Sequence, residues 1–117
     1  MAITHGRLAD PATIPSTAGS LYSNPASTKT FIKGVTLYNS NTTAEVVQLY
    51  VVPDSGGSLG TAAATNQILK ITMATLETYI TEFPGDGIAL NDTNDSLQGV
   101  TTTASKVVAI LHGVKDA

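Results

Sequence analysis

KTFIKGVTLYNSNTTAEVVQLYVV, residues 29–52, is the stretch that decides the fold class of this chain. Its two apolar halves, Lys29–Asn39 and Glu45–Val52, are rich in β-branched and aromatic residues at two-residue spacing, which predicts two β-strands. Gly34 interrupts the alternation in the first half, as a residue at a β-bulge does. The short polar turn Ser40–Thr43 predicts that the two strands pair as a hairpin.

Similar apolar runs on both sides of this stretch predict an all-β protein. An amphipathic helix over 67–77 is the competing interpretation of one run, but the β-branched and aromatic residues after Thr75 favour strands. Turn signals recur at roughly 8–12-residue spacing, so we expect an antiparallel, jelly-roll-like β-sandwich of about seven to eight short strands. The further strands are expected at residues 19–23, 67–73, 76–83, 87–90, 97–103 and 105–114.

The first 26 residues read differently from the remainder of the chain. Pro11, Pro15 and Pro25 each lack the backbone donor that a strand ladder needs, and small polar residues add turn character. We therefore expect residues 1–26 to form an extended N-terminal arm and residues 27–117 to form the sandwich domain. Such an arm is either a disordered tail or an extension that orders against a neighbouring subunit.

Composition excludes several classes of function. The net charge is −3 with 13% charged residues, and the six basic residues are scattered, which argues against nucleic-acid binding. No apolar run reaches the roughly 18 residues of a membrane span. The first residues lack the basic start and apolar stretch of a signal peptide, so we expect synthesis in a cytoplasm without Sec export. The chain has no cysteine, so packing and hydrogen bonds must hold the fold.

No catalytic or metal-binding constellation is visible, so we expect neither enzyme activity nor a cofactor. His112 lies in an apolar strand, and the only other histidine, His5, falls in the predicted arm. Asp92 and Asp95 weakly resemble the start of a calcium loop but lack its glycine and closing glutamate, so turn formation explains them better. The four tyrosines suit ordinary strand packing better than a carbohydrate-stacking face.

Several segments resemble small virion proteins of tailed bacteriophages. In that family, as here, a strand ending in an Asn turn leads into a strand of the form V-x-L-Y-x-V-P. The segments that carry the resemblance are Phe31–Ser40, Thr43–Pro53, Thr75–Tyr79, Gly87–Asn91 and Val107–Gly113. The resemblance implies a jelly-roll-like sandwich located in the virion. It would decorate or cement the capsid, often as a trimer, or form a knob on a head or tail fibre.

The expected partners are other copies of the chain, as a homotrimer, and the major capsid protein or other virion proteins. Exposed sheet edges and an apolar outer face would be covered by such contacts. The fibre-knob alternative would instead use the loops Asp54–Asn66 and Asn91–Ser96 at one end of the sandwich. An enzyme or carbohydrate-binding domain is the least favoured class. The predicted interface residues are Phe31, Val35, Leu37, Tyr50, Val108, Ile110 and His112.

Overall fold

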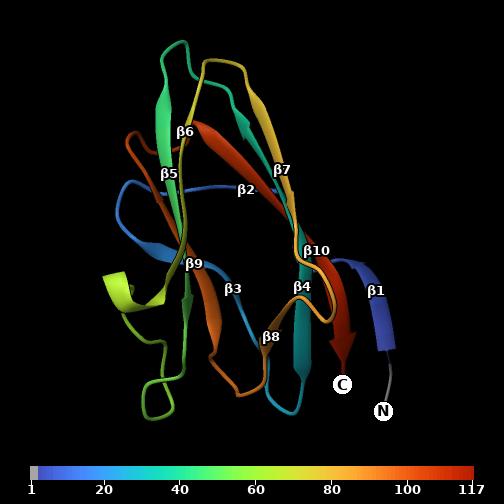
Figure 1. The fold of residues 1–117 in the computed structure, drawn as a ribbon. Helices are drawn as coiled ribbons and strands as arrows, with labels where there is room; N and C mark the ends of the chain where they lie inside the picture. The colour runs from blue at the N-terminus through green and yellow to red at the C-terminus, as the bar shows by residue number, and fades with distance from the viewer. Residues whose placement is uncertain (1–2) are drawn as a thin grey trace.

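The computed structural model describes residues 3–117, and within them ten strands form two antiparallel sheets packed face to face (Figure 1). The all-β antiparallel sandwich expected from the sequence is therefore confirmed. Residues 67–73 form a strand, which excludes the competing helix. In chain order the elements are β1 (Ile3–Arg7), β2 (Ala12–Thr13), β3 (Gly19–Ser23), β4 (Lys29–Asn39), β5 (Glu45–Val52), the 3-10 turn η1 (Ala64–Asn66), β6 (Gln67–Met73), β7 (Thr78–Glu82), β8 (Ile88–Leu90), β9 (Ser96–Thr101) and β10 (Val107–Asp116).

The strands pair in a nested order. Sheet A has the order β1-β10-β4-β7, with β2 beside β10 and β8 beside β4, and sheet B has the order β3-β9-β5-β6. The first strands thus pair with the last, β3 pairs with β9, β4 with β7 and β8, and β5 with β6. The expected jelly-roll-like topology stays a prediction. The strand order leaves β1 and β7 at the edges of sheet A.

The hairpin expected between β4 and β5 does not form. The strand β4 lies in sheet A and β5 lies in sheet B, so the turn after β4 carries the chain from one sheet to the other. Asn39, which is fully buried, holds this crossing: its Nδ2 donates to the carbonyls of Thr43, Met73 and Ala74, and its Oδ1 accepts from the amide of Asn41. A short polar connection fits either route, and here the bonds of Asn39 stabilise the crossing.

Glu45 lies at the same end of the sandwich and is also buried. Its Oε1 accepts from the amide of Thr103 at 2.8 Å, and its Oε2 accepts from Nδ2 of Asn41 at 3.0 Å. Burial alone would raise the pKa of Glu45. The hydrogen bonds from Thr103 and Asn41, with the charge of Lys106, outweigh it and hold the pKa of Glu45 below its ordinary value.

Residues 3–26 belong to the sandwich, which corrects the expectation of an N-terminal arm over residues 1–26; residues 1–2 lie outside the described part of the chain. Both β1 and β2 pair with β10, and β3 pairs with β9. The side chains of Leu8, Ile14 and Tyr22 are buried in the common core. The prolines therefore mark turns between short strands. The domain boundary predicted at residue 27 does not exist in the fold.

A β-bulge reverses the two faces of β4 in mid-strand. Gly34 pairs with His112 of β10, and the next pair joins Ile32 to Gly113, so Lys33 is the extra residue on β4. The bulge suggested by Gly34 is confirmed. Before it, Ile32 points into the core; after it, Val35 and Leu37 do. Gly113 is required opposite the bulge, because a Cβ there would lie 2.1 Å from the carbonyl oxygen of Phe31.

Candidate functional surface

The outer face of sheet A carries apolar side chains where a two-layer sandwich usually carries polar ones. The alternation of β10 turns Val108, Ile110 and Val114 outward, and none of them packs against the core. The register places Tyr38 beside Val108 and Phe31 beside Val114. The edge strands add two isoleucines. The apolar outer face, as we name it, consists of Ile3, Phe31, Tyr38, Ile80, Val108, Ile110 and Val114.

Three of these side chains are strongly exposed: Ile80 by 64%, Ile3 by 62% and Tyr38 by 38%. An isolated exposed apolar residue needs no explanation, but neighbouring ones on one face indicate a contact surface. Ile80 and Ile110 both flank Thr36 on adjacent strands, so the apolar side chains continue across the sheet. This continuity makes the face a candidate for binding another protein.

The outer face of sheet B carries a network of polar side chains. Gln48 lies at its centre and accepts hydrogen bonds at its Oε1 from the hydroxyl of Tyr50 and from Nε2 of Gln67. Gln98 donates to the carbonyl of Gly60, which ties the loop after β5 across this face. This face also has apolar members, since Val46 is half-buried on it and Ile68 of β6 is 42% exposed. The two outer faces differ in that three strongly exposed apolar side chains, Ile3, Tyr38 and Ile80, lie on sheet A.

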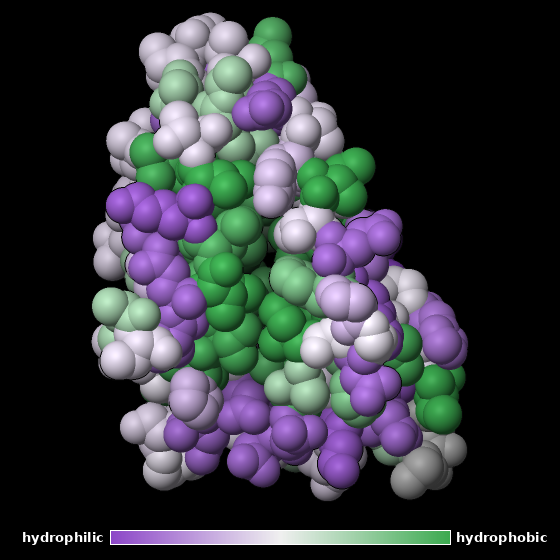
Figure 2. Space-filling model, viewed as in Figure 1, coloured by the Kyte–Doolittle hydropathy of each residue, from purple (hydrophilic) through white to green (hydrophobic). Residues whose placement is uncertain are grey.

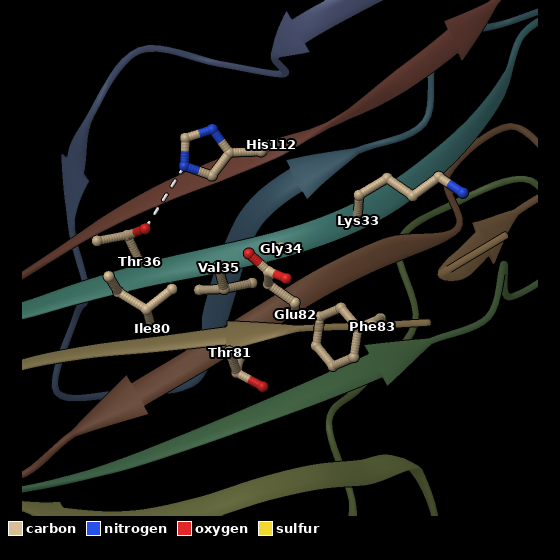
Figure 3. A pocket seen from close by; sticks show the side chains of 9 residues that line it. All are labelled: Lys33, Gly34, Val35, Thr36, Ile80, Thr81, Glu82, Phe83 and His112. Carbon is tan, nitrogen blue, oxygen red and sulfur yellow. Dashed lines mark hydrogen bonds between the residues drawn. The ribbon is translucent and has the colours of Figure 1, made fainter. Parts of the chain in front are cut away.

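A hollow of about 500 Å³ lies on the outer face of sheet A beside Gly34 (Figure 3). Gly34 has no side chain to fill this place. Its cross-strand neighbours His112 and Glu82 flank it on the two sides. The walls combine apolar groups with a charged rim, and they are formed by Lys33, Gly34, Val35, Thr36, Ile80, Thr81, Glu82, Phe83 and His112. The hollow could receive a protruding side chain of a partner protein.

The hollow does not show a catalytic arrangement. His112 and Glu82 lie on strands separated by β4, and adjacent strands are about 4.8 Å apart, so their backbones are about 10 Å apart. The Nε2 of His112 lies 3.5 Å from the hydroxyl oxygen of Thr36 (Figure 3). Within residues 3–117, no group of three His, Cys, Asp or Glu residues is placed to hold a metal ion. The predictions that the chain is no enzyme and binds no cofactor stay predictions.

The predicted interface residues fall into three places. Four of them, Phe31, Val108, Ile110 and His112, lie together on the outer face of sheet A. Tyr50 lies on the opposite outer face, in the polar network of sheet B.

Val35 and Leu37 are fully buried between the sheets, so they cannot form an outer surface in this fold. The predicted interface residues do not include four members of the apolar outer face: Ile3, Tyr38, Ile80 and Val114. Val114 follows the alternation of the last strand, and Tyr38 could have been found by reversing the alternation at Gly34. Ile3 and Ile80 could not, because their place depends on which strands pair.

The two loops named for the fibre-knob alternative meet at one end of the sandwich. The amide of Asp54 donates to Oδ1 of Asp95 at 2.8 Å, and Nδ2 of Asn94 donates to the carbonyl of Gly57 at 2.9 Å. The other carboxylate oxygen of Asp95 accepts from the amides of Asn91 and Asp92. Asp95 therefore organises turns, which agrees with the turn-forming interpretation of this acidic segment.

Comparison with known proteins adds information about the fold. No protein-family model matches the sequence, and no curated protein matches it. A similar solved structure is described as "Bacillus endospore appendages form a novel family of disulfide-linked pili". The TM-score is 0.53 at 17% sequence identity, and the match covers 97% of this chain and 87% of that one. The similarity establishes a shared two-sheet fold. In addition, no helix within residues 3–117 is long and apolar enough to cross a membrane.

Proposed function

We propose that this chain is a structural protein of a bacteriophage particle that decorates or cements the capsid by binding capsid proteins through the apolar outer face of sheet A. The observation that carries the proposal is the difference between the two outer faces. On sheet B, Gln48, Tyr50 and Gln67 bond to one another and Ile68 is 42% exposed, whereas sheet A exposes the larger apolar pair Ile80 and Tyr38 beside a hollow. Burial of apolar area is the main favourable term in most protein association.

The similar solved structure supports an assembly role in a limited way. It is described as part of disulfide-linked pili, and this chain has no cysteine. If this chain assembles, it does so without disulfide bonds. The apolar outer face is the surface best suited to that, because its centre at Ile110 and Thr36 carries no charged side chain.

The experiment is an add-back measurement on purified phage particles made without this chain. Wild-type protein is expected to co-sediment with the particles. Ile110→Lys places a charge at the centre of the apolar outer face and is expected to weaken binding at least about tenfold, or about 1.4 kcal/mol. Val46→Lys is the matched control, since Val46 is also half-buried and lies on the outer face of sheet B.

One control and two possible outcomes decide the particle-binding experiment. Unchanged far-UV circular dichroism of both variants shows that binding, and not folding, is measured. Equal binding of Ile110→Lys and wild type would exclude this face as the binding surface. Absence of wild-type protein from the particle fraction at micromolar concentration would overturn the capsid role altogether.

A fibre-knob function is the second candidate, and the meeting of two loops at one end favours it. The hydrogen bonds from Asp54 to Asp95 and from Asn94 to Gly57 join the loops into one surface. Binding of the isolated protein to cells or glycans, lost on changes in these loops and kept in Ile110→Lys, would favour this function over capsid decoration.

A further inference from the structure

The edge strand β7 has a row of backbone groups with no partner. At the two ends of its ladder with β4, the amide of Asn39 donates to the carbonyl of Glu77, and the amide of Phe83 donates to the carbonyl of Lys33. The odd-numbered residues of β7 therefore bond to β4. In an antiparallel pair the bonding direction alternates, so the N–H and C=O groups of Thr78, Ile80 and Glu82 point away from β4. No other group of residues 3–117 bonds to them.

The other edge strands carry backbone features or positive charges that β7 lacks. In sheet A, β1 contains Gly6 at φ 129° and the basic residue Arg7. In sheet B, the ladders of both edge strands are broken by a bulge, at Leu21 in β3 and at Ile68 in β6. Such features are how natural proteins prevent edge pairing. The sequence of β7, Thr-Tyr-Ile-Thr-Glu, has no proline, lysine or bulge.

We propose that two copies of this chain pair through β7, antiparallel about a two-fold axis, with Ile80 of one copy opposite Ile80 of the other. This register places Thr78 of the first copy opposite Glu82 of the second copy, and Glu82 of the first copy opposite Thr78 of the second. All three pairs use residues whose backbone groups point outward, so three pairs with two bonds each give six hydrogen bonds. The partner is a second copy of this chain, because β7 rotated by 180° offers an N–H and a C=O group opposite each outward C=O and N–H group of the first copy.

The number of hydrogen bonds and the charge of Glu82 together select this register. The adjacent register, with Ile80 opposite Glu82, keeps only two of the three outward pairs within β7. A shift that brings Glu82 opposite Glu82 of the second copy would set two like charges directly across the ladder, which is destabilising. In the proposed register the two Glu82 residues lie four positions apart along the strands, about 14 Å at about 3.4 Å per residue. A shift in the other direction leaves the outward groups of Glu82 beyond the end of the paired strand. The register centred on Ile80 therefore satisfies the most groups.

The side chains next to β7 supply the apolar part of the contact. Ile80 is 64% exposed on one side of the strand. On the other side, a strip of apolar side chains is open to solvent (Figure 2). The inward-facing side chains of Leu69 and Ile71 in β6 and of Tyr79 in β7 are only half-buried against the core. A five-residue edge alone buries less than the roughly 1,200–2,000 Å² of a standard interface. We therefore expect a reversible dimer with a dissociation constant in the micromolar range.

The test is sedimentation equilibrium of the full chain from about 1 to 500 μM. Wild-type protein is expected to move from the monomer mass of 12.0 kDa to twice that mass. Ile80→Lys is expected to stay monomeric, because it opposes two lysines at the axis. Ile3→Lys is the matched control: Ile3 is 62% exposed on the same outer face but lies on the opposite edge strand, so dimerisation should be kept.

A charge exchange makes the test specific to the two-fold axis. Ile80→Glu alone should also be monomeric, whereas an equimolar mixture of Ile80→Lys and Ile80→Glu should form a heterodimer. Only an interface in which residue 80 meets itself predicts this rescue. A wild-type monomer at 500 μM, a trimer such as the sequence resemblance implies, or no rescue in the mixture would each overturn the proposal. Because particle binding is tested separately with Ile110→Lys, either proposal can fail without the other.

Discussion

Replacing Asn39 by alanine should destabilise the protein more than any other removal of a single amide. Asn39 is fully buried, and its two amide hydrogens serve the carbonyls of Thr43, Met73 and Ala74 at 3.1–3.3 Å, while its Oδ1 accepts the amide of Asn41 at 2.9 Å. Each buried group left without a partner costs about 1–3 kcal/mol, and water can reach some of these groups. We expect a loss of about 3 kcal/mol, a large part of the roughly 5–15 kcal/mol that stabilises a domain.

Urea denaturation monitored by circular dichroism measures this loss. With a slope of about 1.5 kcal/mol per M, the midpoint of Asn39→Ala should fall by about 2 M. Asn39→Asp keeps the shape but faces the carbonyl oxygens with an acceptor, so it should be at least as unstable at pH 7. Asn66→Ala, in a loop, is the control and should lose under about 1 kcal/mol. An Asn39→Asp protein as stable as wild type would refute the reasoning.

Two further predictions concern Glu45 and Gly113. The folded state lowers the pKa of Glu45, so its ionised form stabilises the protein above the ordinary pKa of 4.5, and this contribution is lost as the pH falls through the lowered pKa. Glu45→Gln should therefore be less stable at pH 7 and should show a shallower loss of stability below pH 4.5 in urea titrations. A pH profile unchanged from that of the wild type would contradict this. Gly113→Ala should lower the melting temperature by about 10 °C, since the added Cβ would meet the carbonyl of Phe31 and force the bulge open; a melting temperature within about 2 °C of wild type would show that the bulge adapts.

The strands could be predicted from sequence because burial of one side of a sheet imposes two-residue periodicity on the chain. The boundaries of β4 and β5 agree with the expected ones, and so does the bulge beside Gly34. The partner of each strand could not be predicted in the same way. Periodicity shows which side of a strand is apolar, but a polar connection such as residues 40–44 can close a hairpin or cross between sheets. Only the finished core, with Asn39 inside it, decides between these routes.

The candidate surface was predicted in part for the same reason. Val108, Ile110 and His112 follow a regular strand, so their common outward direction could be inferred. Val35 and Leu37 were assigned to the same side as Phe31, yet the bulge between them reverses the direction, and only Phe31 faces outward. A bulge is visible as a glycine in the sequence, but the residue that is inserted, Lys33, is defined only by its partner strand.

The nested pairing has a consequence for how this molecule folds. Ile3 pairs with Asp116, so β1 has no strand to pair with until β10 has been synthesised. Loop closure between such distant segments is slow, and chains dominated by distant pairings reach their native state in milliseconds to seconds. Until β10 has been made, β1 and β2 have no partner and one side of β4 is unpaired. The chain's vulnerability to aggregation should therefore last until β10 has emerged and paired.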